Sequence, residues 1–316
     1  MISKKGRILS GIKPSGKVHL GNYLGALSNW VKLQEEYDAF YMIADLHALT
    51  TAYEDTSNIA EDKKDLMLDL LAIGLDPKKC TLFVQSEVPE HAELHLILSM
   101  VTPLPWLERV PTYKALKEEM KGHDLNTYGF LGYPVLQAAD ILVYNADIVP
   151  VGKDQLPHVE LTREIARRFN NFFGHVFNEP KDKLTEFPIL PGLDGRKMSK
   201  SYNNTINISD ESEVITKKVM TMFTDPTRIK RTDKGHPEKC PVHAYHKIFN
   251  RPERVLQIAQ DCKAAKIGCV DCKKELAVKI NDALKEIHSK RKELSKDFKS
   301  VKKVFTEGAE KARAVT

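Results

Sequence analysis

The segment "RILSGIKPSGKVHLGNYLGAL" (residues 7–27) decides the fold, because it contains a strand, a turn and a helix start in succession. "RILSG" (7–11) has the apolar composition of a buried strand. The Pro-Ser-Gly turn at 14–16 then interrupts the chain, and "HLGN" (19–22) begins a helix. Free N–H groups at a helix start favour phosphate, so the segment predicts a phosphate site beside the end of a strand. An ordinary helix start capped by His19 is the alternative at this point.

Outside this segment, apolar runs and amphipathic runs alternate along the first part of the chain. The apolar runs predict further strands at 39–46, 80–86 and 147–151, and the amphipathic runs predict helices at 23–37 and 61–75. Alternation of this kind predicts a parallel sheet with right-handed crossovers, which is an α/β, Rossmann-like fold.

The strand signals end after Asn207, and the remaining sequence has helical spacing. We therefore predict a Rossmann-like domain at residues 1–205 and a smaller all-helical domain at residues 206–316. Lys and Arg concentrate late in the chain, at 227–239 and 289–303. Such clusters suit a polyanion, because each phosphate contact releases counterions, although a solvated helix face has the same composition.

The composition is that of an ordinary globular protein. The 316 residues carry a net charge of +5, and 42% of them are hydrophobic and 29% charged. That net charge is too small to establish a nucleic-acid partner. No apolar stretch has the length of a signal peptide or a membrane span, so we expect a cytoplasmic enzyme or binding protein.

A second segment, "LDGRKMSKSYNN" (193–204), carries functional groups on a loop. Its Asp-Gly and Asn-Asn pairs are typical of exposed turns. Between them, Lys197 and Lys200 are interleaved with Ser199 and Ser201. Taken alone, this composition also fits a plain surface turn.

These segments together resemble a known enzyme family. "HLGN" after the first strand and "KMSKS" (197–201) in a later loop resemble the two signatures of class I aminoacyl-tRNA synthetases. "SGIKPSGKVHLGNYLGAL" (10–27) and "YPVLQAADILVYNADIVPVGKDQ" (133–155) are similar to the bacterial tryptophanyl-tRNA synthetase family, and the similarity runs along almost the whole chain. The resemblance implies that tryptophan reacts with ATP and Mg²⁺ to give tryptophanyl-adenylate and pyrophosphate, and is then transferred to tRNA(Trp).

The resemblance also assigns roles to the residues of the two signatures. Lys197 and Lys200 would neutralise the departing pyrophosphate while Ser199 and Ser201 donate hydrogen bonds to it. His19 and Asn22 would be catalytic donors to phosphate oxygens. The ATP site as a whole would comprise Lys13, Pro14, Ser15, Gly21, Asn22, Gly152, Lys153, Asp154, Ile189, Lys197, Met198, Ser199, Lys200 and Ser201. Two of these depart from the commoner pattern: Lys13 stands where many members have glutamine, and Lys153 replaces an acidic residue.

The amino-acid pocket is predicted on one helix face. At helical spacing, Tyr133, Gln137 and Asp140 point the same way. A carboxylate suits indole, whose N–H can only donate, but it also suits a phenol O–H, so the helix alone does not exclude a tyrosyl-tRNA synthetase. The first strand has no tyrosine to hold a phenol oxygen, which favours tryptophan. By the resemblance, Asp140 accepts the indole N–H, the ring is lined by Val149, Val151 and Tyr133, and the polar end of the substrate lies near His47 and Gln155.

The sequence contains five cysteines. Cys80 lies beside a strand and is expected to be a small buried hydrophobe. The others are Cys240, Cys262, Cys269 and Cys272, and the last two have metal-ligand spacing. Four thiolates could hold zinc or a [4Fe–4S] cluster, and four unrelated cysteines are a further alternative.

The resemblance favours the iron–sulfur cluster, because a subset of bacterial tryptophanyl-tRNA synthetases carries one on a similar set of cysteines. The interval between Cys240 and Cys262 is one residue shorter than in that set. We expect the site to brace the helical domain and to place the basic residues Arg228, Lys230 and Arg231 against tRNA.

The family resemblance further implies a homodimer, and residues 98–116 supply a surface for it. Leu104, Trp106 and Leu107 flank prolines there, although Trp106 could instead fill the core of the monomer. Two other classes stay open. A nucleotidyltransferase with a similar helix start would lack the long helical domain and the Asp140 pocket. A non-catalytic RNA-binding relative would have damaged signatures, whereas both are intact in this sequence.

Overall fold

The computed structural model describes residues 4–111, 113, 124–184 and 190–316. The chain forms two compact units, and each unit is built from segments that are separated in the sequence. The first contains residues 1–16, 28–186 and 295–316, and the second contains residues 17–27 and 187–294. No helix in the described ranges is long and apolar enough to cross a membrane.

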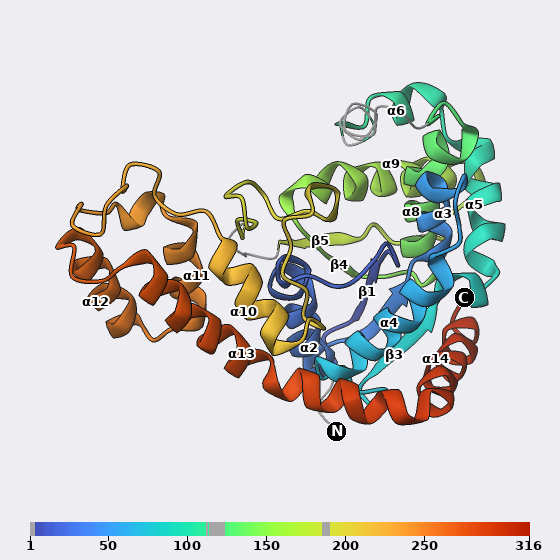
Figure 1. Ribbon diagram of the computed structural model, residues 1–316. Helices are drawn as coiled ribbons and strands as arrows, with labels where there is room; N and C mark the ends of the chain where they lie inside the picture. The colour runs from blue at the N-terminus through green and yellow to red at the C-terminus, as the bar shows by residue number, and fades with distance from the viewer. Residues whose placement is uncertain (1–3, 112, 114–123, 185–189) are drawn as a thin grey trace. The chain divides into compact units, whose positions relative to one another are not determined.

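A parallel sheet of five strands in the order β3-β2-β1-β4-β5 forms the centre of the first unit (Figure 1). The predicted parallel α/β fold is therefore confirmed. The strands are β1 (Arg7–Ile12), β2 (Asp38–Ile43), β3 (Cys80–Val84), β4 (Ile148–Val151) and β5 (Lys181–Leu184). The sequence prediction missed β5, because this edge strand is polar and mostly exposed and so lacks the apolar run of the other four.

Helices of the first unit cover both faces of this sheet. Phe40 and Met42 point into an apolar cluster with residues of α8, α9 and α14, whereas Tyr41 points to the opposite face and stacks on Trp30 of α2 with ring centroids 4.6 Å apart. The helices are α2 (Ser28–Glu36), α3 (Asp45–Ala52), α4 (Ile59–Ala72), α5 (Glu90–Val101), α6 (Leu104–Glu108), α8 (Tyr128–Val143), α9 (Leu156–Phe173) and α14 (Phe298–Arg313), with short 3₁₀ turns at Gln85–Glu87, Lys153–Gln155 and Ser295–Asp297.

The last helix of the chain, α14, packs along the edge strand β3 (Figure 1). Ala309 and Ala312 are buried in the same apolar cluster as Phe83 of β3. The approach is close at Gly308, where a Cβ atom would collide with the carbonyl oxygen of Leu82. Only glycine therefore allows the helix to lie this near the strand.

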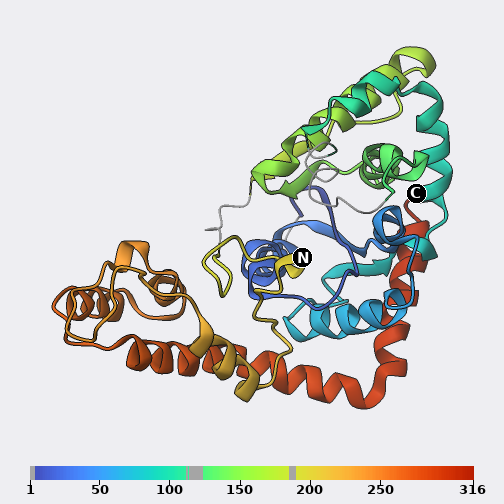
Figure 2. The same cartoon turned by 45° about the horizontal axis from the view of Figure 1, so that its top comes forward.

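The second unit is helical, as predicted for the chain after Asn207 (Figure 2). Its elements are α1 (Leu20–Asn22), a π-helical turn (Tyr23–Leu27), 3₁₀ turns at Lys200–Tyr202 and Pro237–Lys239, α10 (Ser212–Thr221), α11 (Pro241–Phe249), α12 (Pro252–Lys263) and α13 (Cys269–Leu294). The predicted boundary at residue 205 is linear along the chain, whereas the compact units are interleaved. Residues 17–27 pack with the later part of the chain, and residues 295–316 pack with the sheet.

Cys80 occupies the environment that the sequence predicted. Its side chain is buried at the start of β3, and its thiol donates to the carbonyl oxygen of Asp76 at 3.3 Å. Burial raises the pKa of the Cys80 thiol to about 12, so it stays neutral at physiological pH and acts as a small packing residue.

Candidate active site

In the second unit, backbone pairing fixes the helix start at His19 against residues 206–208. The N–H of Leu20 donates to the carbonyl of Ile206 at 2.8 Å, and the N–H of Ile208 donates to the carbonyl of Val18 at 2.9 Å. His19 caps the helix: its Nδ1 accepts from the N–H of Asn22 at 3.2 Å, and the Asn22 side chain accepts in return from the N–H of His19. Because Nδ1 is an acceptor, a neutral His19 carries its proton on Nε2.

His19 is neutral at physiological pH. Its side chain is 7% exposed, and burial, with a smaller contribution from nearby Lys200, lowers its pKa to about 4. The ring therefore offers one N–H donor, at Nε2, without adding a positive charge. That suits a residue beside two lysines, because a third cation would be repelled by them.

The lysine-rich loop lies against this helix start within the same unit. A Cβ atom on Gly21 would lie 3.0 Å from the His19 ring and 3.6 Å from the sulfur of Met198. Met198 is buried, whereas Lys197 is exposed and Lys200 half-buried. The fold thus brings together the two segments that the sequence singled out, although they are almost 180 residues apart.

Asn204 holds the loop in shape. Its side chain is 3% exposed, accepts from the N–H of Ser199 at 2.9 Å, and donates to the carboxylate of Asp194 at 2.7 Å and to the carbonyl of Lys197 at 3.2 Å. Ser199 and Ser201 are linked through their hydroxyls at 2.7 Å. These hydrogen bonds hold the loop in a defined conformation, so it is not a plain surface turn. Sequence reasoning had treated Asn204 only as a turn residue.

In the first unit, Asp140 lies at the centre of a buried polar cluster. The carboxylate is 1% exposed. Its Oδ2 accepts from His47 Nε2 at 2.7 Å, and its Oδ1 accepts from Gln85 Nε2 at 2.7 Å and from His91 Nδ1 at 2.6 Å. Burial raises the pKa of Asp140, but the charge and hydrogen bonds of the two histidines outweigh it and hold the pKa at about 2. Asp140 is therefore ionised and can only accept hydrogen bonds.

Other predicted residues of the first unit follow the carboxyl ends of the strands, where open α/β sheets bind ligands. Lys13, Pro14 and Ser15 follow β1, His47 lies beyond β2, and Gly152 to Gln155 follow β4. Gly152 lies close to Asp154, since a Cβ there would lie 2.7 Å from the Asp154 carboxylate, and the exposed carboxylate would have to move aside. Gln155 donates to the same carboxylate at 2.9 Å.

The remaining predicted residues differ in location and burial. Tyr133 and Gln137 lie on α8 with Asp140, and both are partly buried. Val149 and Val151 of β4 are buried in the apolar cluster that contains Phe40. Ile189 lies outside the described residues.

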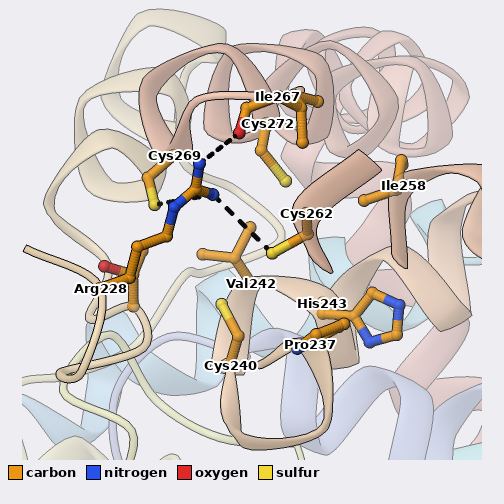
Figure 3. A pocket seen from close by; sticks show the side chains of 11 residues that line it. Arg228, Pro237, Cys240, Val242, His243, Ile258, Cys262, Ile267, Cys269 and Cys272 are labelled. Carbon is orange, nitrogen blue, oxygen red and sulfur yellow. Dashed lines mark hydrogen bonds between the residues drawn. The ribbon is translucent and has the colours of Figure 1, made fainter. Parts of the chain in front are cut away.

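The four late cysteines line one cavity in the second unit (Figure 3). Arg228 lies among them, with its Nη1 3.8 Å from the Cys262 sulfur and 4.0 Å from the Cys269 sulfur. Burial, with smaller contributions from the neighbouring cysteines, raises the pKa of Cys272 to about 12. Without a bound cation, this thiol is neutral.

Two further observations bear on this cavity. Within the described part of the chain, no group of three or more His, Cys, Asp or Glu residues is arranged to hold a metal ion. Arg228 does not fit its predicted role as a surface contact for tRNA. It is buried and donates from Nη2 to the carbonyls of Arg231 and Ile267, both at 2.9 Å. Lys230 and Arg231 are exposed.

Known proteins agree with this arrangement. The family model described as tRNA synthetases class I (W and Y) matches residues 3–285. A protein of Thermotoga maritima named Tryptophan--tRNA ligase is 52% identical over 311 residues, which cover 98% of this chain and 95% of the relative. The chain belongs to the class I tryptophanyl-tRNA synthetase family. The synthetase is also 45% identical to the Tryptophan--tRNA ligase of Aquifex aeolicus, over 98% of this chain and 96% of that protein.

A solved structure extends the similarity to three dimensions. The synthetase matches the crystal structure of tryptophanyl-tRNA synthetase from Campylobacter jejuni in complex with ADP and tryptophan with a TM-score of 0.89 and 36% identity. The match covers 98% of this chain and 95% of that chain. The family resemblance inferred from the sequence motifs is thereby confirmed.

The synthetase also contains site residues that its sequence did not reveal. Gln85 and His91 contact Asp140, and Tyr144 contacts His91, with its hydroxyl 2.8 Å from Nε2. Gln85 had one available signal, since it is the first polar residue after a buried strand. His91 had none, because its neighbours in the sequence do not indicate which way its ring points.

The buried His19 should make the synthetase sensitive to acid. As the pH falls from about 7 to about 5, His19 takes up a proton in the unfolded chain, where its pKa is near 6.5, but not in the folded chain, where its pKa is about 4. The folded state therefore loses stability over this interval. His19→Asn keeps a cap acceptor and lacks the titrating ring, so its urea midpoint should fall less between these pH values than that of the wild type. Parallel losses in the two proteins would contradict the assignment.

Proposed function

We propose that this chain is a tryptophan–tRNA ligase that first forms tryptophanyl-adenylate from L-tryptophan and ATP and then transfers tryptophan to tRNA(Trp). The observation that carries the proposal is the packing of His19, Gly21 and the loop with Lys197 and Lys200 in one compact unit. Relatives named Tryptophan--tRNA ligase, similar over 98% of the chain, support the choice of substrate.

The chemistry demands positioning and charge neutralisation rather than a protein acid or base. A carboxylate oxygen of tryptophan attacks the α-phosphorus of ATP, the bond from that phosphorus to the bridging oxygen breaks, and pyrophosphate leaves with the bonding electrons. Lys197 and Lys200 neutralise the charge that develops on pyrophosphate, while Ser199, Ser201 and the Nε2–H of His19 donate hydrogen bonds. Flexible lysines that strengthen their contacts during the reaction lower its barrier.

Mg²⁺ belongs to the ATP in this scheme. It usually keeps several waters and binds through substrate phosphates rather than through a dedicated protein cage. When bound with ATP, it would neutralise part of the charge of the phosphates.

Asp140 would select the amino acid. As a buried carboxylate that is ionised, it accepts a hydrogen bond from the indole N–H, and a substrate without a donor at that position would leave it unpaired. Tyr133, Val149 and Val151 would line the ring, with Gln137 beside it, and Gln155 would lie near the polar end of tryptophan. His47, expected from the sequence at that polar end, instead contacts Asp140 and would lie beside the indole N–H. Lys13, Pro14, Ser15, Gly152, Lys153 and Asp154 would contact ATP.

Exchange of labelled pyrophosphate into ATP tests the reaction and its substrate. Tryptophan alone among the twenty amino acids should stimulate the exchange strongly. Lys200→Ala should lower its rate by about 100-fold, since it removes one donor from the developing charge, and leave tryptophan binding nearly intact. Lys303→Ala, at an exposed position on α14, is the control and should behave as the wild type.

Two outcomes would contradict this scheme. Exchange stimulated by tyrosine and not by tryptophan would exclude the proposed substrate. Loss of tryptophan binding with a preserved rate in Lys200→Ala would exclude a role for Lys200 in the transition state.

We infer that the active form is a homodimer. Leu96, Ile97, Met100 and Leu104 are exposed on α5 and α6, and Met100 is 74% exposed. Exposed apolar side chains that recur three or four residues apart favour association with a second copy of the chain. Of the three residues predicted for this surface, Leu104 is exposed, Trp106 is partly buried and Leu107 is buried in the core. Residues 112 and 114–116 of the predicted segment lie outside the described residues.

Light scattering at micromolar concentration should give twice the chain mass of 35.8 kDa. Met100→Asp should shift the mass toward that of a monomer, because a buried charge without a partner opposes association. Leu256→Asp, at a similarly exposed apolar side chain of the second unit, should leave the mass unchanged. A monomeric wild type would contradict the proposal.

We also propose that Cys240, Cys262, Cys269 and Cys272 hold a [4Fe–4S] cluster, with zinc as the runner-up metal. The support is that all four side chains line one cavity and that thiolate sulfur is a suitable ligand for both. A bound metal would deprotonate the thiols, and Arg228 would then lie beside anionic sulfur. The cluster would brace this part of the unit and carry no step of adenylation.

Protein purified without oxygen should be brown, with broad violet absorption that bleaches on reduction, and should contain about four irons per chain. Cys269→Ser should lose the colour, whereas Cys80→Ser, at the cysteine outside the cavity, should keep it. A colourless protein with one zinc per chain would favour zinc, and a protein with neither metal would remove the site. Pyrophosphate exchange should persist in each metal-free preparation that remains folded.

A further inference from the structure

The carboxylate of Asp140 is held unevenly by the residues around it. Its Oδ1 accepts two hydrogen bonds, from Gln85 Nε2 and His91 Nδ1, at 2.7 and 2.6 Å. Its Oδ2 accepts one, from His47 Nε2 at 2.7 Å. Each carboxylate oxygen has about two lone-pair positions, so the bonds from described residues saturate Oδ1 and leave one position on Oδ2. The surrounding protein thus determines which oxygen can meet a substrate.

His91 is the most buried of these donors that can ionise. Its side chain is 0% exposed on α5, and both ring nitrogens are engaged. Nδ1 lies 2.6 Å from Asp140, which accepts, and Nε2 lies 2.8 Å from the hydroxyl of Tyr144. When the ring is neutral and donates from Nδ1, its Nε2 accepts from the Tyr144 O–H. Burial raises the pKa of Tyr144, which keeps this hydroxyl protonated.

We propose that His91 is a positioning residue for tryptophan selection: through Tyr144 and its own Nδ1–H, it fixes Asp140 so that Oδ2 faces the indole N–H. His91 itself does not touch the substrate. The inference rests on the proposed function, because it assumes that Asp140 accepts the indole N–H. A matched pair of ligands separates the two ideas: tryptophan, and its isostere in which sulfur replaces the ring N–H (3-benzothienylalanine).

Calorimetric binding to the full-length protein supplies the main test. His91→Leu removes the donor that fixes Asp140, so Oδ2 should no longer meet the indole N–H, and tryptophan affinity should fall about 10- to 100-fold, as expected for loss of one hydrogen bond to a buried charged group. The isostere has no N–H to offer, so its affinity should change less than about 3-fold. His91→Asn restores an N–H near the position of Nδ1 and should recover most of the tryptophan affinity. Pyrophosphate exchange should show the loss in KM rather than in kcat.

The pH profile gives a second readout. The titratable groups that face Asp140 are His47, His91 and His95, with Tyr144 and Glu90 acting on the far side of His91. The wild type should bind tryptophan equally from about pH 8 to about pH 5, since the pKa of Asp140 is about 2. Loss of the His91 donor raises that pKa, so in His91→Leu the fall in tryptophan affinity should begin at a higher pH. The affinity for the isostere should show no such fall at low pH.

Equal losses for tryptophan and the isostere in His91→Leu would overturn the inference, because they would show only a damaged pocket. Unchanged binding of both ligands would overturn it as well. If His91→Leu does not fold, His91→Asn and Tyr144→Phe replace it. A loss of affinity in Tyr144→Phe for tryptophan alone would support the inference. Equal losses of affinity for tryptophan and the isostere would oppose it. A wild-type protein that binds no tryptophan would instead exclude the proposed function.

Discussion

In the first unit, the arrangement at the carboxyl ends of the strands depends on the hydrogen bonds of one buried carboxylate. This carboxylate belongs to Asp140 and is 1% exposed. An isolated charge at such a depth would become neutral or unfold the site. Asp140 remains ionised because three donors reach it, and each comes from a different element: His47 from α3, Gln85 from the turn after β3, and His91 from α5. Those elements can meet only if the parallel strands are in their observed register. The charge and the sheet therefore depend on each other.

In the second unit, the functional charges are the positive charges of lysines rather than a buried negative charge. Its lysines are placed where they can meet phosphate, and the histidine beside them is kept neutral by burial. The loop that carries the lysines is held in shape by hydrogen bonds of a neutral amide, Asn204, to Ser199 and Asp194. The first unit thus carries a buried anion, whereas the second carries lysines on a loop beside a neutral histidine.

The sequence allowed prediction of those features that depend on local patterns. Four strands were predicted from apolar runs, and helical spacing predicted that Tyr133, Gln137 and Asp140 share one face, whereas the role of Asp140 came from the family resemblance and stays a prediction. β5 could not be found, because four polar residues at a sheet edge carry no apolar pattern. His91 and Asn204 could not be assigned roles, because their partners lie far away in sequence. Arg228 was misplaced at the surface for the same reason: a basic cluster does not reveal that one of its members turns inward to bind two carbonyls.

The return of α14 to the sheet has a consequence for how the protein is made. β3 is complete once residue 84 has left the ribosome, yet the helix that packs along it begins at residue 298. During synthesis the apolar surface of Phe83 therefore stays uncovered until residues 298–313 have been made. A nascent chain that still lacks α14 would display that surface to chaperones and proteases. The order of synthesis thus delays the burial of β3 until long after the strand itself has been made.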